Sequence, residues 1–134
     1  MPVKHQIDND LQLIITTVTG EAVDEELIAA MEKYQRDIRS KSDYNKYNEI
    51  LDFSKLTSIG LTNGGIKAIA QIASATDQTD VKTKLALIVK SPLAFGLARM
   101  YQTYRSLNPR ANKESRVFNR SHDAFEWLEH NHFI

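Results

Sequence analysis

Hydrophobic and polar residues recur along this chain in two patterns, one typical of strands and one typical of helices. Five short stretches rich in β-branched or consecutive apolar residues predict strands. They are residues 3–8, 11–18, 50–53, 85–89 and 116–119. Four other stretches repeat apolar residues every three or four positions, as one face of a helix does. These helices are expected to begin near residues 23, 62, 91 and 121. The order β-β-α-β-α-β-α-β-α predicts one α/β domain over residues 1–134, with a mixed, mostly parallel sheet and helical cover.

The strand at residues 85–89 is the firmest part of this prediction. Its sequence, Leu-Ala-Leu-Ile-Val, is apolar without alternation. A strand covered by helices on both faces needs this pattern, so we expect it inside the sheet. Ser91 and Pro92 then predict a helix start, with serine as N-cap and proline at the first helical position. This helix should run to about Leu107, where an Asn-Pro pair stops it.

The helix that starts at Pro92 has a wider apolar face than packing on a sheet requires. Its predicted inner stripe is Leu93, Leu97, Met100, Tyr104 and Leu107, widened by Ala94, Ala98 and Tyr101. Phe95 projects beyond this face. We therefore take Leu93, Phe95 and Arg99 as candidate contacts for a partner protein, a second copy of the chain, or a small apolar ligand. The alternative is that a neighbouring loop covers Phe95.

A second candidate region precedes the helix that starts near residue 62. Residues 54–60 are expected to form a loop with an apolar plug. Thr62 or Asn63 should cap the following helix, and Gly64 and Gly65 leave backbone amides accessible at its start. These four residues are a candidate anion site. The alternative is a plain helix cap with two turn glycines. A Walker loop is rejected because a lysine does not directly follow the second glycine.

Three segments resemble the SpoIIAA-like branch of the STAS family. Residues 50–59, Ile-Leu-Asp-Phe-Ser-Lys-Leu-Thr-Ser-Ile, are similar to its strand-and-loop motif of hydrophobic-Leu-Asp-Leu-Ser-x-hydrophobic. Residues 87–89 and 95–101 are similar to a strand followed by a Gly-x-Ala-Arg-Met-aromatic helix. Residues 117–118 and 124–128 are similar to a closing Val-Phe and Ala-x-x-Trp-Leu. The three segments occur in the family's order.

The resemblance implies a STAS-type fold and a non-catalytic regulatory or binding role. In STAS antagonists, a serine in an Asp-Ser-Ser-Gly-like turn is phosphorylated, which switches partner binding. That turn falls at residues 60–64 of this chain. Gly60 stands at the Asp position, and Leu61 or, with a shift, Thr62 stands at the serine position. The switch serine is therefore missing from its expected place, and the partner that the resemblance implies stays unidentified.

Composition narrows the classes of function. The 134 residues carry no net charge, which argues against non-specific nucleic-acid binding. There is no cysteine, which fits a reducing compartment, and we expect the protein in the cytoplasm. No apolar run approaches the roughly 20 residues that cross a bilayer, and the N-terminus lacks the apolar core of a signal peptide.

The remaining candidate chemistry is sparse, and no cofactor or metal is expected. Asp52 ends a strand, where an α/β enzyme could carry a catalytic carboxylate, but no partner acid or histidine is evident. By its likeness to the STAS Asp, we expect Asp52 to brace the loop that follows it. His130 and His132 have no third ligand nearby.

A basic segment could meet an acidic partner or anionic lipid headgroups, or simply be solvated. It contains Arg105, Arg110, Lys113, Arg116 and Arg120.

Three hypotheses of function follow. The favoured one is a non-catalytic binding or regulatory module with an unknown protein partner. The second is a protein that binds a small apolar ligand or lipid, which predicts an enclosed apolar pocket beside the helix from Pro92. The third is an enzyme that uses Asp52. A homodimer is a further possibility that rests on Phe95 alone.

Overall fold

The computed structural model describes residues 3–41, 43–77, 82–111 and 113–130. They form one five-stranded sheet in which the strands follow the chain order. The strands are β1 (Val3–Asp8), β2 (Leu13–Val23), β3 (Asn48–Gly60), β4 (Thr83–Ile88) and β5 (Lys113–Phe118). β1 is antiparallel to β2, and the other neighbours are parallel. The predicted mixed, mostly parallel sheet is confirmed.

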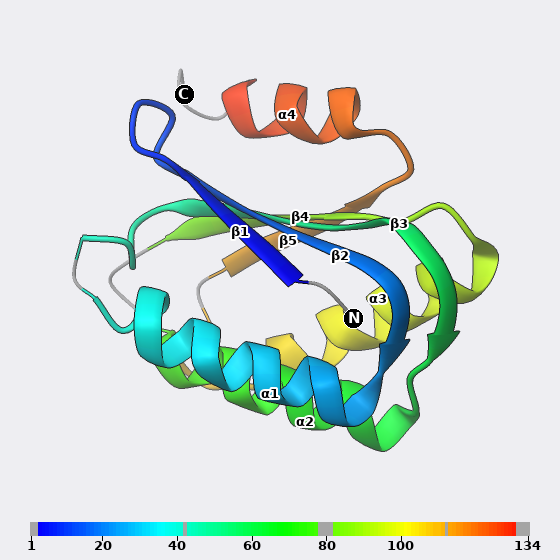
Figure 1. Ribbon diagram of the computed structural model, residues 1–134. Helices are drawn as coiled ribbons and strands as arrows, with labels where there is room; N and C mark the ends of the chain where they lie inside the picture. Colours follow the sequence, from blue (N-terminus) through cyan, green and yellow to red (C-terminus); the bar gives the residue numbers. More distant parts are fainter. Residues whose placement is uncertain (1–2, 42, 78–81, 112, 131–134) are drawn as a thin grey trace.

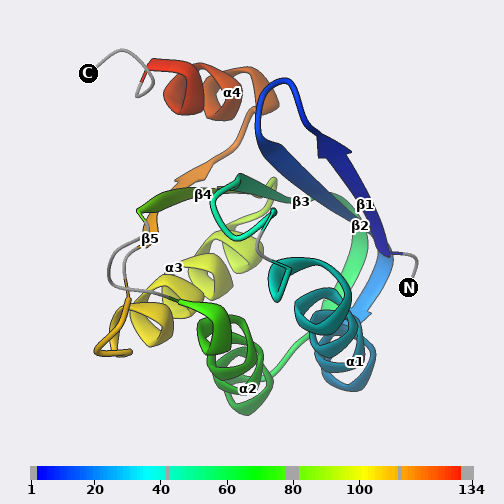
Figure 2. The same cartoon turned by 90° about the vertical axis from the view of Figure 1, so that its left-hand side faces the viewer.

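Helices cover both faces of this sheet. They are α1 (Asp24–Tyr34), α2 (Asn63–Ala73), α3 (Pro92–Ser106) and α4 (Ser121–His130). Figure 1 shows α1, α2 and α3 on one face and α4 on the other, and Figure 2 shows α1, α2 and α3 next to one another under the sheet. A π-helical turn, Gln35–Arg39, extends α1. None of the helices in the described part of the chain is long and apolar enough to cross a membrane.

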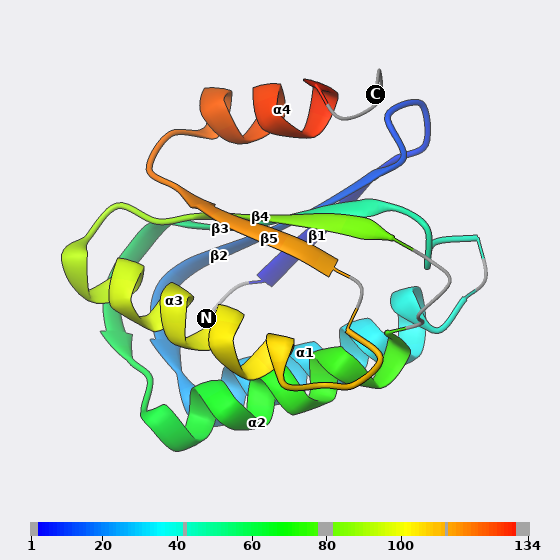
Figure 3. The ribbon, with the colours of Figure 1, turned by 180° about the vertical axis from the view of Figure 1, so that it is seen from behind.

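Two apolar cores lie on opposite sides of β4. Leu85 and Leu87 pack under α1, α2 and α3, whereas Ala86 and Ile88 pack under α4. Successive side chains of a strand point to opposite faces, so a strand between two cores must be apolar at every position. All four side chains are fully buried. The prediction of an interior strand here is confirmed, and Figure 3 shows β4 between β3 and β5.

The prediction that residues 54–60 form a loop is wrong. β3 continues to Gly60, paired in parallel with an equally extended β2. The pairing is interrupted by two register shifts, and Gly20 has a φ of 76°, a conformation that glycine adopts readily. The bulged ribbon bends toward the helices, as the right-hand side of Figure 1 shows. Leu56 and Ile59, predicted as a loop plug, instead pack from this ribbon against the core.

The buried face of α3 is also narrower than the sequence predicted. Its fully buried residues are Ala94, Ala98, Tyr101 and Arg105. The two ends of the predicted stripe, Leu93 and Leu107, are 60% and 70% exposed. The small side chains of the two alanines let α3 lie close to the sheet, so the leucine row falls at the margin of the contact. Phe95 is 45% exposed, as predicted from its position beyond the inner face.

Candidate functional site

The carboxyl ends of β2, β3 and β4 meet at one edge of the sheet, and a helix starts from each of them. α1 follows β2 directly, while short loops connect β3 to α2 and β4 to α3. All three helices therefore begin on the same side of the molecule, the right in Figure 1. Ligands of open α/β sheets bind at this edge. The residues predicted as sites lie at the N-terminal end of α2, in Thr62–Gly65, and in the first two turns of α3, so the fold brings both regions to this edge.

The start of α2 is tied to the start of α1. Thr62 is the N-cap, and its hydroxyl accepts a hydrogen bond from the Gly65 amide at 3.1 Å. The Asp24 carboxylate accepts hydrogen bonds from the Thr62 amide at 3.0 Å and the Thr62 hydroxyl at 2.5 Å. These two bonds lower the pKa of Asp24 below its usual value, so the carboxylate is ionised at neutral pH. Sequence reasoning identified the cap but missed Asp24, whose partner lies 38 positions away.

The Asp24 carboxylate disfavours anion binding at the candidate site, which consists of Thr62, Asn63, Gly64 and Gly65. A β-carbon added to Gly65 would lie 2.0 Å from the Asp24 Oδ1 atom, so this carboxylate lies directly over the helix start. Any further anion there would be repelled by a like charge. Anion binding by these residues stays a prediction, and it now requires Asp24 to be displaced or protonated. Asn63 and Gly64 are exposed, and Gly64 has free space beside it.

The outer surface of α3 is unusually accessible in its first two turns. From Ser91 to Gly96 only Ala94 is buried. A β-carbon added to Gly96 would have no neighbouring atom within 4 Å. Leu93 and Phe95 lie on opposite flanks of the helix, about 160° apart at 100° per residue, with Gly96 on the outer face between them. The candidate contacts thus form a small saddle rather than one continuous patch.

Arg99 lies next to one flank of this saddle. Its guanidinium is 5.9 Å from the centroid of the Phe95 ring. A cation–π contact at an exposed position contributes about 0.5–1 kcal/mol, enough to favour this rotamer but not to fix it. The side chain of Arg99 is exposed, and its pairing with Phe95 gives this flank of the helix both an apolar and a cationic component.

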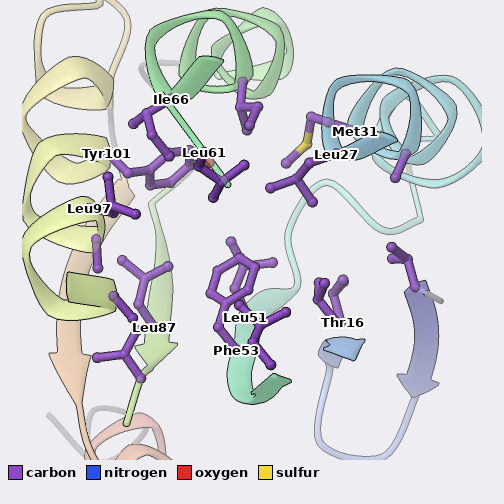
Figure 4. A pocket seen from close by; sticks show the side chains of 18 of the residues that line it. Thr16, Leu27, Met31, Leu51, Phe53, Leu61, Ile66, Leu87, Leu97 and Tyr101 are labelled. Carbon is purple, nitrogen blue, oxygen red and sulfur yellow. The ribbon is translucent and has the colours of Figure 1, made fainter. Parts of the chain in front are cut away.

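A cavity of about 70 Å³ lies beneath the helical layer. Its walls come from β1 to β4 and from α1, α2 and α3. Figure 4 shows Phe53 from the sheet facing Leu27 and Leu61 across it. Apart from His5, Thr16, Tyr34 and Tyr101, the described lining residues are apolar. The apolar-ligand hypothesis predicted a pocket beside α3, and Leu97 and Tyr101 of α3 line this one.

A buried charged cluster around Glu49 was not predicted. The Lys113 Nζ atom lies 2.7 Å from Glu49 Oε2, and the Arg39 Nε atom lies 3.5 Å from Oε1. The Tyr34 hydroxyl donates a hydrogen bond to Oε1. Burial alone would raise the pKa of Glu49, but the charges of Lys113 and Arg39, together with these hydrogen bonds, outweigh burial and hold it at about 2. The carboxylate is therefore ionised under all ordinary conditions.

A second buried pair lies near this cluster. The Arg105 Nη2 atom is 2.7 Å from Asp77 Oδ1, and Nη1 donates to the Tyr101 hydroxyl at 3.0 Å. Glu49 lies near the amino end of β3 and Lys113 begins β5, so the charges gather at the edge opposite the helix starts. Ligand sites of such folds lie at the carboxyl edge, so we interpret this cluster as structural.

These contacts remove two residues from the candidate basic segment. Arg105 and Lys113 are buried ion-pair partners and cannot be part of a basic surface. Arg116 lies over the Trp127 ring at 5.4 Å, and Arg120 pairs with Asp123 at 3.4 Å. Arg110, Arg116 and Arg120 are exposed, so the two alternatives for this segment, a surface for an acidic partner or anionic lipid and a solvated stretch, now concern these three residues. One signal in the sequence could have indicated the buried ion pairs. Glu49 is two positions before Leu51, so in a strand its charged side chain points to the same, inward face.

The remaining candidate residues are Asp52 and the histidines near the end of the chain. Asp52 Oδ1 accepts hydrogen bonds from the Ser54 amide at 2.9 Å and hydroxyl at 2.6 Å, which is the bracing role expected for it. His132 and the side chain of His130 lie outside the described part of the chain. Within that part, no group of three or more potential metal ligands occurs.

Comparison with known proteins supports the fold. The sequence matches no known family model and no curated protein. The structure is similar to the crystal structure of an uncharacterized protein of the DUF3478 family, with a SpoIIAA-like fold, from Shewanella loihica PV-4. The TM-score is 0.53 at 15% identity, covering 95% of this chain and 92% of that one. The chain therefore has an α/β fold of the SpoIIAA-like type, as its sequence motifs predicted. At this identity the similarity concerns the fold alone.

Proposed function

We propose that this protein is a non-catalytic STAS-like binding module that docks a partner protein on the outer face of α3. The observation that carries the proposal is the saddle at Gly96, flanked by Leu93 and Phe95. The backbone of a partner can approach α3 closely at a glycine with free space above it. Two large apolar side chains would then be buried on either side of the approaching segment.

The energetics of the saddle favour a small, specific contact. Full burial of a leucine or phenylalanine side chain contributes about 1.5–3 kcal/mol relative to exposure. Leu93 and Phe95 still have about half of their surface to lose, so together they supply on the order of 2–3 kcal/mol. Arg99 adds a cation beside Phe95. The matching partner segment carries apolar side chains and a carboxylate, and the exposed Asn63 offers a polar contact at the neighbouring helix start.

The proposal assigns Asp52 a structural role, because its Oδ1 atom accepts two hydrogen bonds from Ser54. A reducing cytoplasm, which the absence of cysteine fits, is the proposed location. The proposal also does not need a phosphorylated serine at the start of α2. Leu61 has no hydroxyl and lines the cavity, while the Thr62 hydroxyl already donates to Asp24.

The test compares aspartate substitutions of exposed apolar residues at the two ends of α3. The tagged chain is mixed with an extract of its source cells, and the amount of recovered partner is compared with the amount of tagged protein. Leu93→Asp and Phe95→Asp should each lower recovery at least tenfold. Leu107→Asp changes a leucine that is 70% exposed just after the other end of α3; it is the control and should leave recovery unchanged. Equal recovery of the partner by all three variants would show that Leu93 and Phe95 do not contact it.

The partner can also be a second copy of the chain. Light scattering of the purified protein decides this case. A dimer that becomes a monomer in Phe95→Asp, but not in Leu107→Asp, would identify the partner as the protein itself. A monomer in every sample leaves a different protein as the partner that the pull-down must find.

A further inference from the structure

The two edges of the sheet differ in how they are protected. β1 and β5 are the outer strands, and Figure 2 shows them at opposite margins. The Phe118 carbonyl of β5 accepts a hydrogen bond from the Val89 amide and faces β4, so the Ser115 carbonyl, three residues earlier, faces outward. Gln102 of α3 donates a hydrogen bond to this outward carbonyl at 3.0 Å. A side chain therefore covers part of the β5 edge, where unpaired groups would otherwise attract another strand.

The backbone groups of β1 alternate between β2 and the outside. The Asn48 amide donates to the Gln12 carbonyl at 3.0 Å, and the next N–H, that of Leu13, points the opposite way, toward β1. Leu13 is the partner of Asp8, whose backbone groups therefore point toward β2. The outward groups, which have no hydrogen-bond partner among the described residues, belong to Val3, His5 and Ile7. The β1 edge is open, and its pairing with β2 has no register shift.

The side chains of β1 are complementary to those of a second β1 strand. Lys4, Gln6 and Asp8 share the face that points away from the helical layer, because the alternate residues line the cavity beneath it. In an antiparallel pair centred on Gln6, Lys4 of each copy is opposite Asp8 of the other. His5 is then opposite Ile7, and both have outward backbone groups, as an antiparallel hydrogen-bonded pair requires. Opposite charges across such a pair are stabilising.

Exposed apolar side chains lie at the same end of the sheet. Ile7 is 36% exposed, and Leu11, in the turn between β1 and β2, is 48% exposed. The other large apolar side chains that are exposed in the described part of the chain lie on α3 or just after it. A strand added along β1 would cover Ile7, so the open edge carries an apolar contact as well as backbone and charged ones.

We propose that two copies of this chain associate through β1, antiparallel about Gln6, so that their sheets form one continuous sheet. The interface is isologous, so each contact occurs twice. The two pairs of His5 with Ile7 supply about four backbone hydrogen bonds, and the two pairs of Lys4 with Asp8 lie outside them. Because this contact is small, the dimer forms and dissociates with concentration. It shares no residue with the α3 saddle and does not depend on the proposed function.

The first experiment follows the association of the chain by sedimentation equilibrium. The wild type should dimerise, and a protein that stays monomeric up to about 1 mM would overturn the proposal. Ile7→Pro removes an outward N–H that β2 does not use, so β1 should stay paired with β2 while association weakens at least tenfold. Ile7→Val keeps this N–H and should lose much less. Unchanged association of an Ile7→Pro protein that still unfolds cooperatively would exclude the β1 edge.

Charge reversals test the register of the pair. Lys4→Glu and Asp8→Lys each place two like-charged pairs in the dimer and should weaken association about tenfold. In an equimolar mixture of these two variants both pairs again have opposite charges, so a dimer with one copy of each should form. Lys90→Glu, an exposed reversal outside β1, should associate as the wild type does. A mixture of the two folded variants that associates no better than either alone would contradict this register.

Asp8 also stabilises the turn after β1, because its Oδ1 atom accepts hydrogen bonds from the Asp10 and Leu11 amides at 3.0 Å. The fold of Asp8→Lys is therefore checked by circular dichroism before mixing. Phe95→Asp separates this interface from the α3 saddle and should leave the dimer intact. A dimer that is lost in Phe95→Asp but kept in Ile7→Pro would place the contact on α3 and overturn the β1 proposal.

Discussion

The Asp24 carboxylate, at the first residue of α1, holds both the amide and the hydroxyl of Thr62, the N-cap of α2. One side chain therefore fixes the relative position of two helix starts at the carboxyl edge of the sheet. The same carboxylate occupies the space above Gly65. The start of α2 is therefore held in place by Asp24. The carboxylate of Asp24 occupies the position where the sequence suggested that an anion could bind.

The first prediction concerns the two adjacent glycines at the start of α2. Gly65→Ala should destabilise the protein, because its β-carbon would push Asp24 off Thr62 and break both hydrogen bonds. Gly64→Ala is the matched control, since its β-carbon would meet only the Thr62 hydroxyl at 4.0 Å. Urea midpoints measure the difference. In an Asp24→Ala background the extra cost of Gly65→Ala should disappear, and a persistent cost would show that Asp24 is not the cause.

The second prediction concerns the cap itself. Thr62→Ala removes the acceptor for the Gly65 amide and should lower the free energy of unfolding by about 1 kcal/mol. Thr62→Ser keeps the hydroxyl and should stay within about 0.5 kcal/mol of the wild type. Chemical denaturation of the three proteins provides the measurement. Equal stability of the alanine and serine variants would contradict a capping role.

The third prediction concerns Glu49. Glu49→Gln leaves Lys113 and Arg39 buried without a counter-charge, which should cost about 3–5 kcal/mol of unfolding free energy at pH 7. Because the folded-state pKa of about 2 lies below the ordinary value of 4.5, the stabilisation from Glu49 is fully present above pH 4.5. It declines as the pH falls from 4.5 toward 2.

Denaturant titrations at several pH values follow this decline. The gap in stability between the wild type and Glu49→Gln should be constant from pH 7 to about 5 and should shrink below pH 4.5. Exposed Glu129→Gln serves as the control and should run parallel to the wild type over the same range. A gap that stays constant down to pH 3 would mean that Glu49 is not held ionised by its neighbours.

The fourth prediction concerns the pair of Arg105 and Asp77. Arg105→Met leaves the Asp77 carboxylate buried without its cation and should cost about 3–5 kcal/mol. Arg110→Met, at an exposed position of the same predicted basic segment, should change stability by less than about 0.5 kcal/mol. Thermal unfolding compares them. The double change of Arg105→Met with Asp77→Leu should recover part of the loss, because no unpaired charge then remains buried.

Local pattern in the sequence determined the elements and their order. The apolar run at β4, the Ser-Pro start of α3 and the cap at Thr62 are signals within a few residues, and each was confirmed. The three family-like segments led to the SpoIIAA-like fold for the same reason, since each spans one element and its boundary. Phe95 was correctly placed outside the buried face because helical periodicity fixes the direction of a side chain.

Only the tertiary structure decided which distant residues meet. The extension of β3 to Gly60 depends on pairing with a bulged β2. Arg105 and Lys113 were expected at the surface, but they are buried because they pair with Asp77 and Glu49. The cavity beneath α1, α2 and α3 likewise depends on how closely these helices approach the sheet. Periodicity reports which way a side chain points from its own backbone, whereas ion pairs, cavities and strand pairing depend on what lies opposite, and that is set by the packing of the whole chain.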